Sequence, residues 1–227
     1  MRTTRILGTL LLVALPFTVT RSQEPDLPRA FDSRARLDGL DSVVYRLAPE
    51  SRLEVKTGKA GLFGFAGHSH SIRARAFTGQ VVYYPRMTDS SHLELTVTAD
   101  SLEVLTPPDT AEIRKVTEAM RTEVLHTDQY PQIRLVSRTV TRIPDGFRVI
   151  GGLTLAGQTR DISIEVHVEL GSDTLRAKTT FAVKQSDFGI KPYSGGPAGT
   201  VKVADKVKFD IEVIAIRAVP NAIRTGR

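Results

Sequence analysis

The stretch Ile162-Ser163-Ile164-Glu165-Val166-His167-Val168 alternates apolar and polar side chains without a break. In a β-strand every second side chain points to the same face, so four aliphatic side chains face one medium and three polar ones face water. The same alternation recurs from Leu93 to Ala99, from Leu175 to Val183 and from Val207 to Val213. The sequence therefore predicts an all-β fold, in which an antiparallel sheet of about eight strands closes around a core or around a cavity for one small ligand.

Turn-forming residues separate the expected strands. They lie at Pro144-Asp145-Gly146, at Ala156-Gly157-Gln158 and at Leu170-Gly171-Ser172-Asp173, and turns this short pair the strands on either side antiparallel. We expect strands at Val43–Leu47, Leu53–Thr57, His68–Tyr84, His92–Ala99, Gln132–Thr141, Phe147–Leu155, Thr159–Val168, Thr174–Lys184, Thr200–Val203 and Lys206–Ile216.

One segment departs from the strand period. After Thr106-Pro107-Pro108, Asp109 can cap a helix. Apolar residues then recur at spacings of three and four, at Ile113, Val116, Met120 and Val124. The pattern predicts an inserted amphipathic helix of about four turns that ends before Pro131. Its apolar stripe needs a partner surface, and the open end of the barrel offers one, so we expect the helix to act as a lid.

The first residues have the pattern of a secretory signal, because Arg2 and Arg5 precede the apolar run Ile6–Leu15, which Pro16 ends. This run is shorter than the roughly 20 residues that span a bilayer, and no later stretch is apolar enough for a membrane helix. We expect a signal peptide at 1–22, a flexible segment at 23–42, the barrel domain at 43–217 and a flexible tail at 218–227. The protein would then be exported and soluble, either periplasmic or secreted.

Composition excludes several kinds of function. The chain has no cysteine, so it can form neither a disulfide nor a lipid-modified amino terminus, and its core alone must stabilise it. Loss of residues 1–22 would remove Arg2, Arg5 and Arg21 and lower the net charge from +6 to +3. This charge is spread over alternating strand faces without a basic run, so we expect no nucleic-acid partner.

Eight short elements, taken in order, resemble the YceI-like family of exported bacterial proteins. They are Tyr45, Gly67-His68-Ser69-His70, Phe77-x-Gly79, Ser101-Leu102, Tyr130-Pro131-x-Ile133-x-Leu135-x-Ser137, Gly152-Leu153-Thr154-Leu155-x-Gly157-x-Thr159, Asp187-Phe188-Gly189-Ile190 and Val203-x-Asp205-x-Val207. The resemblance covers nearly all of the chain after the signal. It implies an extended, lipocalin-like antiparallel barrel with a long apolar pocket that takes a polyisoprenoid or a similar acyl-type chain.

The candidate ligand-binding residues are apolar side chains expected to face the barrel interior or its lid. They are Phe63, Phe65, Ile72, Leu95, Val97, Met120, Leu155, Ile164, Val166, Phe181, Phe209 and Ile211. If the barrel is hollow, each buried methylene of a ligand contributes about 0.8 kcal/mol, so a long chain needs few polar contacts. The same side chains could instead fill a solid core, because apolar alternation is typical of filled barrels and of hollow ones.

His68 and His70 stand two residues apart and would share one face of a strand. Two imidazoles so placed can bind one metal ion, but no carboxylate or cysteine stands nearby at a ligand spacing. We therefore expect no metal and assign both histidines to the polar head of a ligand at the barrel mouth. The sequence holds no recognisable catalytic constellation and no nucleotide-binding loop, so we expect neither catalysis nor a cofactor.

Three functions stay open at this point. The first is an exported carrier that sequesters an amphiphilic lipid chain of the polyisoprenoid or fatty-acyl type. The second is a stress-protective or protein-interaction module whose barrel is filled by its own side chains. The third is an enzyme or metal site built around His68 and His70. The sequence also leaves a homodimer open as the oligomeric state.

Overall fold

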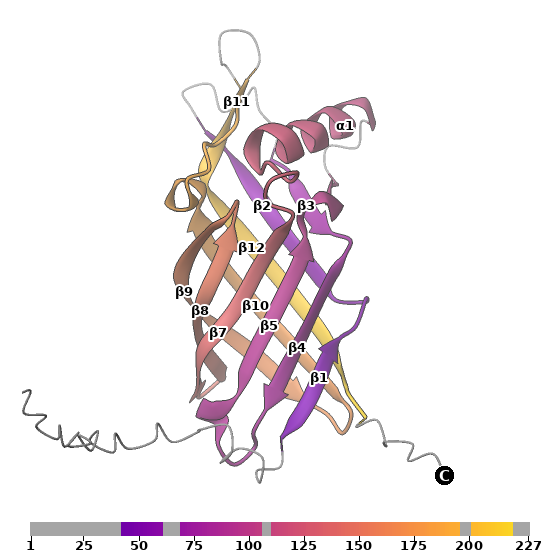
Figure 1. Ribbon diagram of the computed structural model, residues 1–227, viewed down its shortest axis with the longest axis vertical. Coiled ribbons are helices and arrows are strands. Elements are labelled where there is room, and N and C mark those ends of the chain that lie inside the picture. The colour runs from indigo at the N-terminus through magenta and orange to yellow at the C-terminus, as the bar shows by residue number, and fades with distance from the viewer. Residues whose placement is uncertain (1–41, 61–68, 106–109, 196–200, 220–227) are drawn as a thin grey trace, which may run out of the picture. The chain divides into compact units, whose positions relative to one another are not determined.

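The alternating stretches form strands that share one sheet (Figure 1). The computed structural model describes residues 42–60, 69–105, 110–195 and 201–219. Its strands are β1 (Val43–Leu47), β2 (Arg52–Ala60), β3 (Ser71–Ala74), β4 (Phe77–Tyr83), β5 (His92–Thr98), β6 (Leu102–Val104), β7 (Gln132–Ile143), β8 (Gly146–Leu155), β9 (Gln158–Leu170), β10 (Thr174–Lys184), β11 (Ser194–Gly195) and β12 (Val201–Arg217).

Eight of these strands close into a barrel. Their order is β1-β4-β5-β7-β8-β9-β10-β12, and β12 pairs again with β1, with every pairing antiparallel. Toward one end, β2 pairs with β12, β3 with β2, and β6 with β3. Three long strands of the wall are thus each interrupted once. Their two parts are β1 and β2, β3 and β4, and β5 and β6. The predicted closed antiparallel barrel of about eight strands is confirmed.

The strand boundaries differ from the expected ones at two places. The expected strand His68–Tyr84 is split into β3 and β4 at Arg75 and Ala76. The two expected strands at the carboxyl end are one continuous strand, β12, because a bulge between Val203 and Val207 absorbs the irregular register. The predicted hairpin turns are confirmed, and Gly146 and Gly157 supply the positive φ angles of 142° and 73° that two of them need.

The inserted helix is α1 (Thr110–Ala119), and one π-helical turn, Met120–Val124, continues it. It lies across one end of the barrel (Figure 1). Ile113, Val116 and Met120 pack against Leu102 and Val104 of β6 and against neighbouring strands. The apolar stripe predicted from the spacing therefore faces the barrel, and the expected capping residue Asp109 lies outside the described residues.

The middle of the barrel is filled by its own side chains. We call this layer the partition; its members are Leu53, Leu95, Val97, Leu135, Leu153, Ile164, Phe181 and Ile211. Leu95, Leu135 and Leu153 are register neighbours on three consecutive wall strands, so their side chains lie in one row. The phenyl ring of Phe181 stacks on that of Phe209, with ring centroids 4.6 Å apart.

Two wall strands pair along only part of their length. The ladder between β9 and β10 runs from Leu170 opposite Leu175 to His167 opposite Lys178. Beyond it, the Thr179 hydroxyl donates to the Glu165 carbonyl at 2.7 Å, and Arg160 Nε donates to the Asp187 carbonyl at 2.8 Å. Hydrogen bonds from side chains thus replace the hydrogen bonds between the two backbones where the strands diverge.

Candidate ligand-binding cavity

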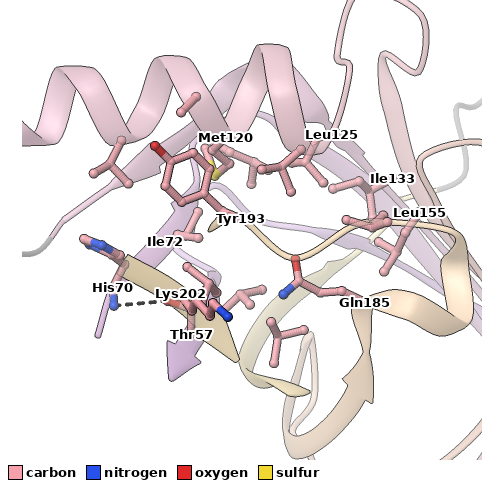
Figure 2. A pocket seen from close by; sticks show the side chains of 18 of the residues that line it. Thr57, His70, Ile72, Met120, Leu125, Ile133, Leu155, Gln185, Tyr193 and Lys202 are labelled. Carbon is pink, nitrogen blue, oxygen red and sulfur yellow. Dashed lines mark hydrogen bonds between the residues drawn. The ribbon is translucent and has the colours of Figure 1, made fainter. Parts of the chain in front are cut away.

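A cavity of about 360 Å³ lies between helix α1 and the partition. Figure 2 shows the helix above it, with side chains from several strands pointing into the same space. The volume lies in the range of ligand pockets in proteins, roughly 300–1,000 Å³. The barrel is therefore hollow at the helix end and filled across its middle.

The wall of the cavity consists of inward positions on the strands. It includes Val55, Ile72, Ile133, Leu155, Val207 and Phe209. The roof comes from α1 and the turn that follows it, and includes Val116, Ala119, Met120, Val124 and Leu125. These side chains are apolar because the strand and helix periods turn the polar residues of the same segments outward.

The floor of the cavity is the partition. Side chains on one strand face repeat every second residue, so the inward residue below Ile133 is Leu135, and the one below Leu155 is Leu153. Both are buried in the core and neither lines the cavity. Phe209 is the aromatic residue of the lining that meets this layer, through its stack on Phe181. A chain that enters under α1 meets packed side chains after a short distance.

A second, smaller void lies on the other side of the partition. Its volume is about 80 Å³, and its lining includes Val81, Leu93, Val140, Phe147 and Leu175. The ring of Phe147 meets that of Tyr83 edge to face, with centroids 6.3 Å apart. The partition separates this void from the larger cavity.

Several polar groups also line the cavity. They are Thr57, His70, Glu112, Lys115, Gln185, Tyr193 and Lys202. The backbone N–H of His70 donates to the Thr57 hydroxyl at 3.2 Å (Figure 2). Gln185 Nε2 donates to the Ala204 carbonyl at 2.9 Å. Such a lining suits an amphiphilic molecule, because its apolar part can lie against the apolar side chains and its polar part against the polar groups.

The structure brings five of the predicted ligand-binding residues together at the cavity. These are His70, Ile72, Met120, Leu155 and Phe209. They come from β3 and the segment before it, from the turn after α1, from β8 and from β12. That they bind a ligand stays a prediction.

Six other predicted residues do not line this cavity, and that they bind a ligand also stays a prediction. Leu95, Val97, Ile164, Phe181 and Ile211 belong to the partition, and Val166 borders the small void beyond it. Ile164, for example, is only 5% exposed and packs within the core. Their inward orientation is as expected, and Val97 and Ile164 are buried by the core side chains packed around them.

The remaining predicted residues, Phe63, Phe65 and His68, lie outside the described residues. The His68 and His70 pair is therefore not tested. Within the described ranges, no group of three or more His, Cys, Asp or Glu side chains is placed to hold a metal ion.

Sequence reasoning missed several residues that line the cavity. Lys115 and Lys202 look like ordinary solvated charges in the sequence, yet one stands on α1 and the other on β12, and both line the cavity. For Lys115 a signal exists, because it stands four residues before Ala119 and so lies at the edge of the apolar stripe of the helix. Nothing local identifies Lys202, Tyr193 or Gln185, since strand pairing and the turn after β10 place them.

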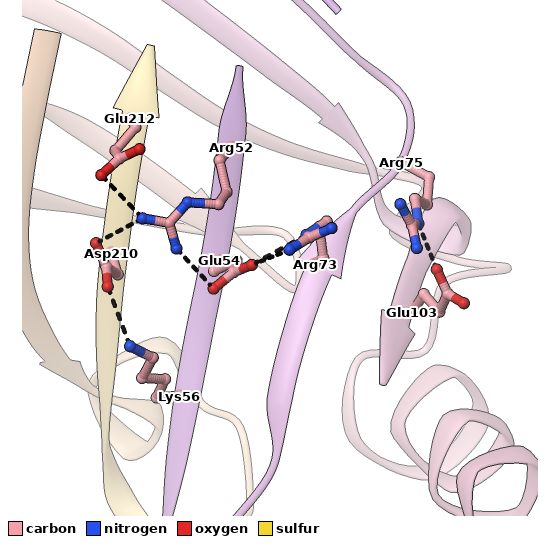
Figure 3. A network of polar contacts seen from close by, with 8 residues as sticks. All are labelled: Arg52, Glu54, Lys56, Arg73, Arg75, Glu103, Asp210 and Glu212. Atoms are coloured by element: carbon pink, nitrogen blue, oxygen red, sulfur yellow. Dashed lines mark hydrogen bonds and ion pairs between the residues drawn. The ribbon is translucent and has the colours of Figure 1, made fainter. Parts of the chain in front are cut away.

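A polar network on the outside holds the wall formed by β2, β3 and β12 (Figure 3). Glu54 is only 5% exposed. It accepts from Arg52 Nη1 at 3.0 Å and from Arg73 Nη2 at 2.6 Å. The Lys56 ammonium donates to Asp210 at 3.1 Å and holds the pKa of that carboxyl below its usual value. Charged side chains from three strands thus cross-link this wall.

We expect the substitution Glu54→Gln to destabilise the barrel by about 1–3 kcal/mol, because the buried acceptor loses its charge while both arginines remain. Urea denaturation followed by circular dichroism measures this loss. The control is Glu103→Gln, which removes the charge from an exposed pair with Arg75 and should cost no more than about 1 kcal/mol. Equal losses in the two variants would contradict the special role of Glu54.

Comparisons with known proteins show which family the chain resembles. The family model described as a YceI-like domain matches residues 45–215. No curated protein matches the chain at a significant level.

Solved structures agree with the family match. The crystal structure of Burkholderia cenocepacia BcnA is similar with a TM-score of 0.60 and 17% identity, over 74% of this chain and 98% of that one. A polyisoprenoid binding domain from Saccharophagus degradans, implicated in plant cell wall breakdown, has a TM-score of 0.55 and 14% identity, over 78% and 100%. Campylobacter jejuni YceI protein has a TM-score of 0.51 and 16% identity, over 65% and 85%. At these identities the similarity shows a shared fold.

None of the helices in the described ranges has the length and apolar character needed to cross a membrane.

Proposed function

The chain belongs to the family of YceI-like domains. We propose that it is a binding protein that holds an amphiphilic lipid chain under helix α1. The chain would be of the polyisoprenoid or fatty-acyl type. The observation that carries the proposal is the cavity of about 360 Å³, with an apolar wall, an apolar roof and a few polar groups. The Saccharophagus degradans domain, whose name states polyisoprenoid binding, supports the same class of ligand.

The energetics of burial favour such a ligand. Each methylene that moves from water into the cavity contributes about 0.8 kcal/mol, so several methylenes outweigh the cost of ordering the chain. The polar lining groups then orient the head rather than supply most of the affinity. We assign no catalytic role to any residue in this proposal.

The proposal includes the compartment. The charged start and apolar run of residues 1–16 support export, and we propose that the protein acts in the periplasm or outside the cell. Fractionation of the native host, with detection of the protein in the periplasmic and secreted fractions, tests this part. Retention of the uncleaved chain in the cytoplasm would contradict it.

Native mass spectrometry of the protein purified from its host tests the ligand directly. We expect a discrete added mass that organic extraction releases as a lipid. An empty protein that also fails to bind added palmitate or geranylgeraniol would contradict the proposal.

The substitution Val116→Asp locates the site. Val116 lines the cavity, so we expect an unpaired carboxylate there to weaken palmitate and geranylgeraniol binding at least tenfold, a loss of about 1.4 kcal/mol or more. The control Ala111→Asp adds the same charge at an exposed position of the same helix and should bind both probes as the wild type does. Equal binding by the two variants, with thermal unfolding showing both folded, would place the ligand elsewhere.

A further inference from the structure

The cations at the cavity bear on the chemistry of the ligand's head. Lys115 of α1 and Lys202 of β12 both line the cavity, and both are exposed. The lysine ion pairs among the described residues belong instead to Lys56 and Lys178. Within the described part of the chain, the ammonium groups of Lys115 and Lys202 have no ion-pair or hydrogen-bond partner.

Several other polar groups of the lining already interact inside the protein. The Thr57 hydroxyl accepts from the His70 amide, and Gln185 Nε2 donates to the Ala204 carbonyl. Glu112, the acidic member of the lining, has an interaction of its own. The strongest donors left for a ligand are therefore the two lysine ammonium groups.

The apolar interior decides where a charged head can lie. Burial of a charge among the aliphatic side chains of the wall and roof would carry a large desolvation cost. At the exposed lysines the head keeps part of its hydration and gains two opposite charges. The tail then occupies the apolar space between the roof and the partition.

Resting on the proposed function, we infer that the cavity selects a single-chain lipid with an anionic head, either a carboxylate or a phosphate, held by Lys115 and Lys202. The two lysines come from segments far apart in the sequence, and the fold alone brings them to one cavity. They act as specificity-determining residues, because a neutral or cationic lipid of the same length gains nothing from them.

Four probes with the same dodecyl tail test the inference: laurate, dodecyl phosphate, dodecanol and dodecylamine. We expect at least one of the two anions to bind about five to ten times more tightly than dodecanol, and dodecylamine to bind most weakly. Added salt should reduce the preference, because the lysines are exposed. The ratio of laurate to dodecyl phosphate affinity identifies which anion the site favours.

The double variant Lys115→Gln, Lys202→Gln should bind the anions about five to ten times more weakly and so lose the preference for them over dodecanol. The control double variant Arg114→Gln, Lys206→Gln removes two exposed cations from the same helix and the same strand, neither of which lines the cavity, and it should keep the preference. Binding of dodecanol without any preference for the anions, or loss of the preference in the control as well, would overturn this inference and leave the proposed function standing. Failure of all four probes to bind would overturn both.

Discussion

Replacement of Phe209 by alanine is expected to lengthen the chain that the cavity accepts. The Phe209 ring lines the cavity and stacks on Phe181 of the partition, with the ring planes 1° apart. Its removal opens space toward the partition, and a longer tail can bury further methylenes there at about 0.8 kcal/mol each. The preference for palmitate over laurate should therefore rise about tenfold or more relative to wild type.

Competition between laurate and palmitate, measured by the displacement of a fluorescent fatty acid, gives this preference. The variant should also lose about 2–4 kcal/mol of stability, since the ring leaves a cavity behind it. The control is Phe147→Ala, which removes the same ring beside the smaller void and should destabilise the protein without changing the preference. If both variants keep the wild-type ratio, Phe209 does not limit the length of the chain.

The substitution Met120→Asp is expected to destabilise the whole barrel rather than merely loosen the helix. Met120 lines the cavity, is only 8% exposed and packs in one cluster with Leu53, Ala74 and Val97. A carboxylate in this position is buried among apolar side chains and should cost about 3–5 kcal/mol, a large part of the roughly 5–15 kcal/mol that stabilises a typical domain.

Urea denaturation of Met120→Asp, with Met120→Leu and Ala111→Asp as controls, measures this cost. The leucine variant keeps the apolar volume and should lose less than about 1.5 kcal/mol, and the exposed Ala111→Asp should change stability little. A stable Met120→Asp protein that has lost only its ligand would show that the turn after α1 is detachable. The expected result instead limits any lid motion to the part of α1 before this turn.

Much of the fold could be predicted from residue periodicity. The period of two in Ile162–Val168 placed β9, and the spacing of Ile113, Val116 and Met120 placed α1 with its apolar stripe toward the barrel. These predictions held because the pleat and the helical turn are local properties of the chain. The bulge that makes β12 continuous and the short strand β6 were not predicted, because neighbouring strands determine both.

The candidate site was less predictable than the fold. Ile164 and Leu155 both face inward, yet Ile164 packs in the partition and Leu155 lines the cavity. Both are aliphatic residues on alternating strands, and the volume of their neighbours across the barrel makes the difference. A sequence pattern predicts which side chains of a strand face inward. It does not predict how far the opposite wall of the barrel lies from them.

Residues close together in the chain set the strand and helix periods, the side chains that face inward, and the apolar stripe by which α1 covers the barrel, so all three could be inferred from the sequence. That the barrel is hollow under α1 and filled at the partition depends on packing across the barrel, which joins side chains from distant parts of the chain, so no sequence pattern shows it. The same holds for Lys115 and Lys202, which line one cavity because the closure of the barrel brings α1 near the first residues of β12.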